Sequence, residues 1–537
     1  MNVDYIIIGA GSAGCVLANR LTANGRHRVL LLEAGGDDQR LWLHVPIGYG
    51  RSFYNPNVNW MYRTEPDPGL DNRQGYWPRG KVLGGSSAIN ARVFMRGHPA
   101  DFDDWAATGM TGWGWNDVLP YFKKLEDNGA GADDLRAVGG PLHVSDVSRE
   151  LHPVGKIFIE AALQAGLGVT PDFNGHQMEG VGPYQITTRD GWRQSTARAY
   201  LRPAMKRANL RVETHAHATR IVFDGARATG VAYRQHGQMR MAHARCEVVV
   251  SAGAVNSPLL LQCSGVGPAT VLQGAGIEVA YDHPAVGRNL QDHLCIDHLY
   301  RTRVPTLNNV LRPLHGKILS GLQYALFRRG PLSLSVNQYG GFVRTRPQAT
   351  SPTVQLYFSP LSYTKSAPGK RPLMSPDREP GFLLSMQPCR PMSRGHIQVR
   401  SSDPLAPPVI VPNSLSEPQD MEDMLDGMVL ARRLAATPAL AGIITQEVLP
   451  GASVLSREEM IEDVRKRAVT VYHPASTCRM GLDPRTSVVN QRLAVHGLDR
   501  LRVVDASVFP SVTSGNTNAP VIMVAEKAAD LILEDAI

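Results

Sequence analysis

The chain begins with the stretch Asp4-Tyr5-Ile6-Ile7-Ile8-Gly9-Ala10-Gly11-Ser12-Ala13-Gly14. A β-branched apolar run followed directly by Gly-x-Gly-x-x-Gly predicts a buried parallel strand that turns into a helix. Residues 15–24 carry apolar side chains at helical spacing, and residues 28–32 predict a second strand that ends at Glu33. The stretch therefore predicts the βαβ unit with which a Rossmann-like sheet begins.

The glycines of this unit indicate a dinucleotide site. Gly9 allows the tight turn, Gly11 lets the backbone approach a pyrophosphate, and Gly14 lets the helix pack on the strand. Glu33 follows Gly14 by 19 residues, where a carboxylate accepts ribose hydroxyls. An acid at this position disfavours a 2′-phosphate, so FAD or NAD is expected rather than NADP.

Related pieces occur at the other end of the chain. Residues 247–250 and 501–504 predict further strands, and residues 520–533 predict a helix with Pro520 in its first turn and Thr517 or Asn518 as its cap. We therefore expect a discontinuous domain and a second domain between its parts.

The predicted fold combines an α/β, Rossmann-like FAD-binding domain with an α+β substrate-binding domain, built on an antiparallel sheet flanked by helices. The middle of the chain predicts strands within 395–412, helices over 419–437 and 457–468, and loops over 127–140 and 364–381. The expected FAD-binding segments are 1–150, 205–300 and 490–537. The expected substrate-binding segments are 151–204 and 301–489.

The composition excludes several classes of protein. Hydrophobic residues make up 43% of the 537 residues and charged residues 19%, which is typical of a folded enzyme. The net charge of +8 comes without a long basic run, so nucleic-acid binding is not expected. The six cysteines form no CxxC pair and predict reduced thiols in the cytoplasm. No export signal or spanning segment is visible, so we expect at most peripheral contact, at the inner face of the cytoplasmic membrane.

Four later motifs carry candidate chemistry. Residues 78–90 and 251–258 are rich in small residues, which lets a backbone run against a flat ligand. The other two contain Tyr472-His473-Pro474 and Ser514-Gly515-Asn516-Thr517-Asn518. A metal site at Asp292, His293 and His298 is not expected, because no further ligand has suitable spacing. Cys478 is interpreted as a packed thiol.

In this order, the five motifs resemble those of the glucose–methanol–choline (GMC) family of flavin-dependent oxidoreductases, over essentially the whole chain. The branch of bacterial choline, sorbose and aliphatic-alcohol dehydrogenases is the most similar. The resemblance implies that His473 is the catalytic base beside flavin N5 and that Asn516 is the second active-site residue. Ile89 stands where some members tether FAD through a histidine, which implies noncovalent FAD.

The fingerprint and the resemblance together predict the FAD contacts. These are Gly9, Gly11, Ser12, Gly14, Glu33, Ala34, Val82, Gly85, Asn90, Val93, Ala218, Ala252, Asp505, Ala506 and Thr517. Trp60 and Tyr472 are the expected substrate contacts, whereas the Trp113 and Trp115 pair is interpreted as core. No carboxylate for a cationic substrate can be assigned within 300–345.

The expected reaction is oxidation of a primary alcohol to an aldehyde, with hydride transfer to flavin N5 and electrons passed to a quinone-type acceptor. A neutral imidazole suits removal of the hydroxyl proton, a role worth about 10²–10⁴ in rate. The amide of Asn516 suits a hydrogen bond to the developing alkoxide. The alternatives are an oxidase that releases H₂O₂, a choline or sorbose-like dehydrogenase, a lyase or photodecarboxylase on the same scaffold, and a non-catalytic flavin-binding protein. The sequence does not determine the substrate or the oligomeric state.

Overall fold

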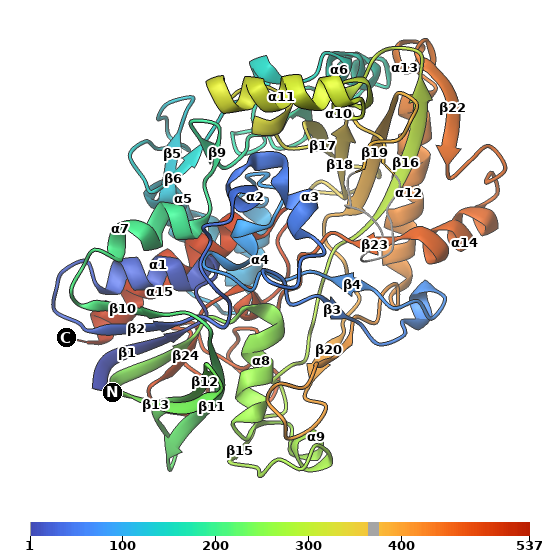
Figure 1. Ribbon diagram of the computed structural model, residues 1–537. Coiled ribbons are helices and arrows are strands. Elements are labelled where there is room, and N and C mark those ends of the chain that lie inside the picture. The colour runs from blue at the N-terminus through green and yellow to red at the C-terminus, as the bar shows by residue number, and fades with distance from the viewer. Residues whose placement is uncertain (1, 364–374, 537) are drawn as a thin grey trace.

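A computed structural model describes residues 2–363 and 375–536 of the chain, and it contains two sheets that lie side by side (Figure 1). The first part of the predicted loop 364–381 lies outside the described residues. Both chain ends lie beside the first sheet (Figure 1). The expected mixed architecture, with a Rossmann-like layer and an antiparallel layer, is confirmed.

The first sheet contains the predicted βαβ unit. β1 is buried along almost its whole length and pairs in parallel with both β2 and β13, as an uninterrupted apolar run requires. The strands in spatial order are β10 (Leu210–Glu213), β2 (Val29–Leu32), β1 (Asn2–Ile8), β13 (Gln238–Val250), β12 (Arg227–Gln235) and β11 (Ala216–Asp224), with β24 (Leu501–Val503) paired to β13. The last three strands of the path form an antiparallel meander.

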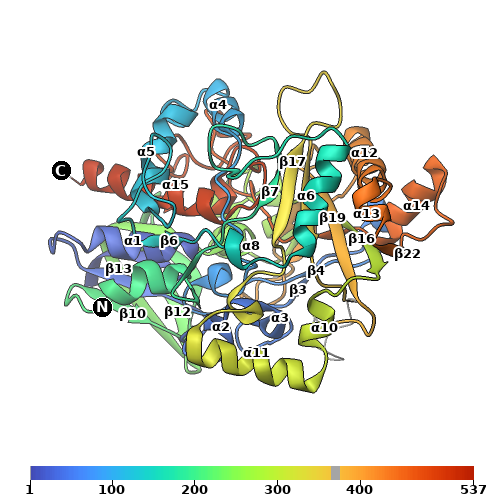
Figure 2. The same ribbon diagram turned by 90° about the horizontal axis from the view of Figure 1, so that it is seen from above.

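The second sheet is antiparallel and lies beside the first when seen from above (Figure 2). Its strands in order are β22 (Ile444–Leu449), β16 (Leu294–Thr302), β19 (Gly381–Pro388), β18 (Val354–Ser359), β17 (Tyr339–Val343) and β7 (Gly180–Pro183), with β23 (Val469–Thr470) paired to β16. The helices around it are α6 (Val154–Gln164), α12 (Pro418–Ala435), α13 (Pro438–Ala441) and α14 (Arg457–Arg467). α12 and α14 confirm the predicted helices 419–437 and 457–468.

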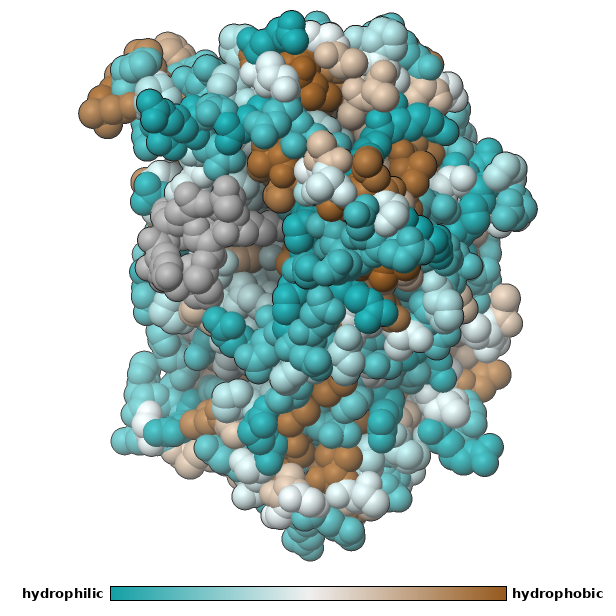
Figure 3. Space-filling model, turned by 90° about the vertical axis from the view of Figure 1, so that its right-hand side faces the viewer, coloured by the Kyte–Doolittle hydropathy of each residue, from teal (hydrophilic) through white to brown (hydrophobic). Residues whose placement is uncertain are grey.

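Further helices and short strands lie outside the two large sheets. They are α2 (Leu41–His44), α3 (Tyr49–Ser52), β3 (Tyr62–Arg63), β4 (Tyr76–Trp77), α4 (Pro99–Ala107), β5 (Glu126–Asn128), β6 (Leu142–Val144), β8 (Thr188–Arg189), β9 (Trp192–Arg193), α7 (Arg202–Ala204), α8 (Gly253–Cys263), β14 (Val266–Gly267), α9 (Ala269–Gly274), β15 (Tyr281–Asp282), α10 (Leu307–Leu311), α11 (Leu314–Phe327), β20 (His396–Gln398) and β21 (Val409–Val411). In the space-filling view, most of the visible face is hydrophilic, and a projecting corner at the upper left is hydrophobic (Figure 3). Within the described residues, no helix is both long and apolar enough to cross a bilayer.

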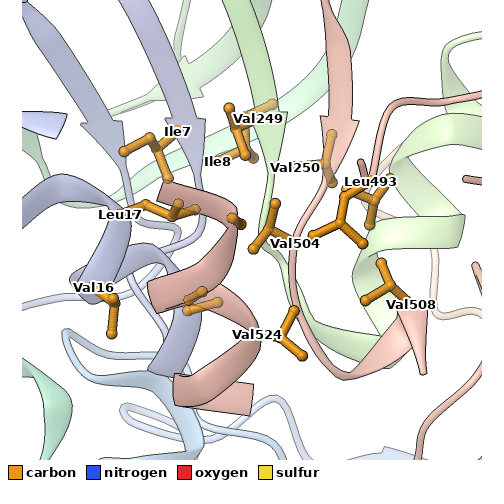
Figure 4. Close-up of a cluster of buried hydrophobic side chains, with 14 of the residues drawn as sticks. Ile7, Ile8, Val16, Leu17, Val249, Val250, Leu493, Val504, Val508 and Val524 are labelled. Atoms are coloured by element: carbon orange, nitrogen blue, oxygen red, sulfur yellow. The ribbon is translucent and has the colours of Figure 1, made fainter. Parts of the chain in front are cut away.

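The core of the first layer lies between its sheet and three helices: α1 (Ser12–Leu21), α5 (Trp115–Leu125) and α15 (Asn518–Asp535). Figure 4 shows Ile7 of β1 beside Leu17 of α1, and Val524 of α15 in the same cluster as Val504 and Val508. α15 confirms the predicted C-terminal helix, with Pro520 in its first turn. The two ends of the chain therefore bury their apolar side chains against each other. Trp113 also lies in this core, and Trp115 packs against it.

The sheets shift the predicted domain limits. Residues up to 300 were assigned to the FAD-binding part, but β16 begins at Leu294 and belongs to the second sheet. Conversely, residues 197–201 pack against α1, and Val488 and Val489 lie in the core of the first layer. We propose domain limits that follow these contacts, because a strand and its hydrogen-bonded partners form one cooperative unit.

Candidate active site

One long cavity runs between the two sheets, with a volume of about 360 Å³. Strand ends and loops of both layers line it. The predicted residues on its walls are Gly9, Gly11, Ser12, Glu33, Ala34, Gly85, Asn90, Val93, Ala218, Ala252, Asp505, Ala506, Thr517, Trp60, Tyr472, His473 and Asn516. The fold thus brings residues from five distant motifs to a single cavity.

The glycine turn forms the floor of one end of this cavity. Gly9 has a φ of +98°, and a Cβ there would lie 2.6 Å from the carbonyl oxygen of Ser251, so only glycine fits. A Cβ on Gly85 would lie 2.6 Å from the Cα of Gly11, so the two small-residue loops touch. α1 begins directly after Gly11, which places its free N–H groups and positive dipole end at the cavity.

Two further helices begin at the same cavity. Ser12 at the start of α1 donates through Oγ to Oδ1 of Asn518 at the start of α15, at 2.8 Å. α8 begins at Gly253, which also lines the cavity. Three helix N-termini therefore converge on one space, an arrangement that favours bound negative charge.

Two buried carboxylates hold the loops around this end. Glu33 accepts the backbone N–H groups of Ala10 at 2.9 Å and Gly35 at 2.8 Å. Burial raises the pKa of Glu33 to about 7, although these hydrogen bonds oppose the shift. Asp505 accepts from the backbone of Gly253 at 2.9 Å, and burial raises its pKa as well. Asp505 therefore joins the C-terminal motif to the loop that opens α8.

Two predicted contacts lie away from the cavity walls. Among the described residues that line the cavity, neither Gly14 nor Val82 occurs. A Cβ on Gly14 would lie 1.8 Å from the carbonyl oxygen of Gly9, so its role is close packing of helix on strand. Val82 is fully buried in a cluster with Leu43 and Val58. The side chain of Val82 therefore packs in this apolar cluster and does not line the cavity.

A chain of hydrogen bonds orients His473 at the other end. His293 Nε2 lies 3.0 Å from the carbonyl oxygen of Cys389, so this nitrogen carries the proton and donates. His293 Nδ1 is then a lone pair and accepts from Nδ1–H of His473, at 3.0 Å. His473 Nε2 is consequently the free base, and the amide Nδ2 of Asn516 donates to it at 3.1 Å.

The pKa values of both imidazoles agree with this assignment. Burial, first of all, lowers the pKa of His293 to about 4. Burial also lowers the pKa of His473 well below 6.5, with further contributions from His293 and the Arg79 guanidinium. Both rings are therefore neutral at neutral pH, and His473 can accept a proton.

The amide of Asn516 has a fixed orientation as well. Its Oδ1 accepts from Gln355 Nε2 at 3.5 Å, which leaves Nδ2 turned toward His473. Gln355 is fully buried on β18 and also donates to the hydroxyl of Tyr184, at 3.0 Å. Gln355 of the antiparallel sheet thus fixes the orientation of Asn516, which lies just before α15.

Asp292 fixes the backbone that carries the base. Its Oδ1 accepts the backbone N–H of His473 at 2.7 Å, and its Oδ2 accepts from the hydroxyl of Thr470. Arg79 Nη2 donates to the carbonyl oxygen of Tyr472 at 2.6 Å, and Tyr472 has a φ of +72°. These contacts hold a strained backbone in place, which is common at functional sites.

The sequence singles out residues 292, 293 and 298 only as candidate metal ligands. The described residues contain no cluster of three or more side chains suited to a metal ion. His298 is buried and faces Tyr300 rather than the cavity. His293 lies directly before β16 and belongs to no motif, so only its contact with His473 shows its role.

Trp60 lines the cavity at its contact with His217 and Lys81. Its ring makes an edge contact with His217 at 5.4 Å, and Lys81 Nζ lies 4.4 Å from the ring centre. Its backbone N–H donates to Arg79, which directs the side chain toward the end of the cavity that holds Ala34. Trp60 lines the cavity that contains His473, and its role as a substrate contact stays a prediction. Tyr472 does adjoin the base.

Two family models described as GMC oxidoreductase match residues 3–295 and 391–525. The chain belongs to the GMC oxidoreductase family. It is 43% identical to the alcohol dehydrogenase [acceptor] of Pseudomonas putida over 99% of this chain and 95% of the relative. It is 42% identical to the oxygen-dependent choline dehydrogenase of Photobacterium profundum over 99% of this chain and 93% of the relative.

The fold is also that of a GMC-type flavoenzyme. The crystal structure of pyridoxine 4-oxidase from Mesorbium loti superposes with a TM-score of 0.87 and 32% identity, covering 98% of each chain. This GMC chain is accordingly an FAD-dependent oxidoreductase that acts on CH–OH donors.

The residues present fit FAD. The carboxylate of Glu33 has four acceptor positions and uses two of them on backbone N–H groups, so ribose hydroxyls can still donate to it. The touching glycines at 11 and 85 leave bare backbone where a pyrophosphate must approach, at the start of α1. Asn90 and Val93 line the wall between this end and His473.

The GMC cavity also contains a carboxylate that the sequence left unassigned. Asp297 on β16 lines it and accepts from the hydroxyl of Ser385, at 2.6 Å. The aromatic rings of Tyr357 and Tyr363 line the same cavity. Asp297 lies just before residues 300–345, the range in which the sequence assigns no carboxylate for a cationic substrate.

Proposed function

We propose that this enzyme oxidises a primary alcohol to an aldehyde, with His473 as the base. The observation that supports the proposal is the lone pair of His473 Nε2, held 3.1 Å from the amide nitrogen of Asn516. These are the two groups that an alcohol hydroxyl needs: one accepts its proton, and the other donates to the oxygen as negative charge develops. The alcohol oxygen would insert between them.

The surrounding residues hold His473 and Asn516 in the orientation that this reaction needs. The proton that His473 accepts rests on Nε2, while Nδ1–H continues to donate to His293. The amide of Asn516, aligned by Gln355, donates to the oxygen of the substrate. FAD, when bound, supplies the acceptor for the hydride that leaves the carbon atom. The helix N-termini at the cavity stabilise negative charge that arises there.

Single-turnover kinetics test this assignment. Under anaerobic conditions, a panel of alcohols should bleach the flavin absorbance of the wild-type holoenzyme. His473→Ala should retain FAD and lose at least about 10²-fold in the rate constant of bleaching. His176→Ala changes a surface histidine whose side chain is 76% exposed, and it serves as the control. Near-normal bleaching by His473→Ala would exclude His473 as the base.

We propose that FAD is bound without a covalent bond. Ile89 lines the cavity at the position where related enzymes carry a linking histidine, and its hydrocarbon side chain packs against Ala88 and Val82. A side chain without a nucleophilic atom cannot form such a link. Acid precipitation should therefore leave a colourless polypeptide and release all the flavin, whereas yellow protein would refute the proposal.

We also propose a quinone-type acceptor, used at the inner face of the cytoplasmic membrane. This rests on the relative that is named for an unspecified acceptor. Activity with a soluble quinone should exceed activity with O₂, measured as H₂O₂ release. If peroxide accounts for all the alcohol consumed under air, the enzyme is an oxidase instead.

A second candidate substrate is a cationic alcohol such as choline. Asp297 provides a carboxylate and Tyr357 and Tyr363 provide ring faces, which together suit a quaternary ammonium group. Choline dehydrogenases are among the similar proteins. Asp297→Asn should then raise the KM for choline and leave that for a neutral alcohol of the same shape unchanged. Ser385→Ala, which removes only the hydroxyl that Asp297 binds, serves as the control.

A further inference from the structure

Helix α11 turns its apolar side away from the protein. Its buried residues are Gly316, Ser320 and Tyr324, spaced four residues apart on one face. A Cβ on Gly316 would lie 2.0 Å from the carbonyl oxygen of Val310, so this face is pressed closely against the chain. The opposite face presents Leu314, Ile318, Leu319, Leu322 and Leu326 to solvent, and Phe327 at the end of the helix is exposed as well.

This exposure is large, and α11 carries more exposed large apolar side chains than any other described helix. Leu314 is 73% exposed, Leu326 is 71% exposed and Phe327 is 67% exposed. Helix α12, by contrast, buries Met424, Leu425 and Met428 against the second sheet. An apolar face of this extent on an ordered helix indicates a surface that meets another apolar phase. α11 lies at the edge of the molecule in Figures 1 and 2, at the place of the hydrophobic corner in Figure 3.

Lys and Arg residues flank this apolar face, and the segment of sequence around α11 contains no Asp or Glu. Residues 298–376 contain eleven Lys and Arg residues and no Asp or Glu, while the whole chain has a net charge of only +8. Lys317 lies on α11, and Arg328 and Arg329 follow its last residue. Within the described part of the chain, no carboxylate pairs with these three residues. The charge around α11 is thus suited to a negatively charged partner.

We propose that α11 docks this enzyme on an anionic phospholipid bilayer, lying in the interface with its leucine face among the acyl chains. A helix of 14 residues is about 21 Å long, too short to span a bilayer and sufficient to lie in its surface. An apolar face with cationic flanks is the pattern of such interfacial helices. A second copy of the chain fits less well, since a symmetric contact would oppose the two sets of cations.

The helix that precedes α11 packs against residues of the active-site cavity. Leu307 and Leu311 of α10, directly before α11, pack with Tyr49 and Tyr363. Both tyrosines line the cavity that contains His473. Docking through α11 would therefore place the cavity near the bilayer, where a lipid-soluble quinone is dissolved. This placement rests on the proposed quinone acceptor, whereas the docking itself does not.

Vesicle sedimentation of the FAD-loaded enzyme tests the docking without any turnover. The probes are vesicles of phosphatidylcholine alone and of phosphatidylcholine mixed with phosphatidylglycerol. We expect binding to the anionic vesicles that weakens as salt is raised. Leu322→Gln with Leu326→Gln should lower partitioning at least about tenfold. Lys317→Gln with Arg329→Gln should lower it by about fivefold for each lost charge.

Met239→Gln with Leu455→Gln removes two equally exposed apolar side chains elsewhere and should leave partitioning unchanged. Flavin bleaching by alcohol should be normal in every variant, which separates a failure of docking from a failure of the proposed function. The proposal is wrong if the wild type stays in the supernatant with anionic vesicles, or if the control pair reduces binding as much as the α11 pair. It is equally wrong if the α11 pair instead converts a dimer to a monomer, measured by light scattering.

Discussion

Replacing His293 by leucine tests the orientation of the catalytic base. The substitution leaves a side chain of similar size but removes the acceptor for His473 Nδ1–H, which His293 provides at 3.0 Å. A buried donor left without a partner costs about 1–3 kcal/mol. His473 then gains by moving or by changing its tautomer, and Nε2 ceases to be the free base. At about 1.4 kcal/mol for each factor of ten, the expected loss is about 5- to 150-fold in rate.

The assay is the stopped-flow rate of flavin bleaching by a saturating alcohol, with FAD content checked by absorbance. His293→Asn is the informative partner variant, because its amide oxygen can replace the Nδ1 lone pair, and it should recover most of the rate. His298→Asn removes an equally buried imidazole from the same strand that does not contact His473. The reasoning is refuted if His293→Leu keeps FAD and the wild-type rate, or if His298→Asn slows bleaching equally.

Three other predictions follow from single contacts. Burial lowers the pKa of His473, so its imidazole stays neutral as pH falls. The acid limb of the pH profile of kcat/KM should therefore lie well below pH 6.5. An acid limb at or above pH 6.5 would contradict a neutral His473. Glu126→Gln leaves Arg96 buried without its ion-pair partner, which should cost about 3–5 kcal/mol and lower Tm in thermal unfolding; an unchanged Tm would contradict this. Gly85→Ala forces a side chain into a left-handed turn against the neighbouring glycine loop, so FAD content after purification should fall sharply while the far-UV circular dichroism stays unchanged.

Local patterns predicted the elements well where one physical requirement dominates. A strand buried on both faces must be apolar throughout, so residues 4–8 and 247–250 were recognisable, and the glycines of the first turn have no substitute. The helices over residues 419–437 and 457–468 follow from their periodicity. His473 and Asn516 were found because they lie in motifs that a family shares.

The partners of these residues could not be found in the same way. His293 is 180 residues from His473 in sequence, and Gln355 is 161 residues from Asn516. No spacing rule links such positions, because their contact depends on how two sheets pack. The surroundings of Trp60 depend on tertiary structure in the same way, because its ring contacts His217 and Lys81 from other segments of the chain.

The sequence by itself determined the Rossmann-like start and the dinucleotide fingerprint, since both depend on residue types at short, fixed spacings, and its family motif singled out His473 as the proposed base. Only the tertiary structure decided which nitrogen of His473 is free, which carboxylate enters the cavity, and which face of α11 meets the solvent. These properties depend on atoms that distant segments bring together. A hydrogen bond or a buried face exists only once both of its sides are in place.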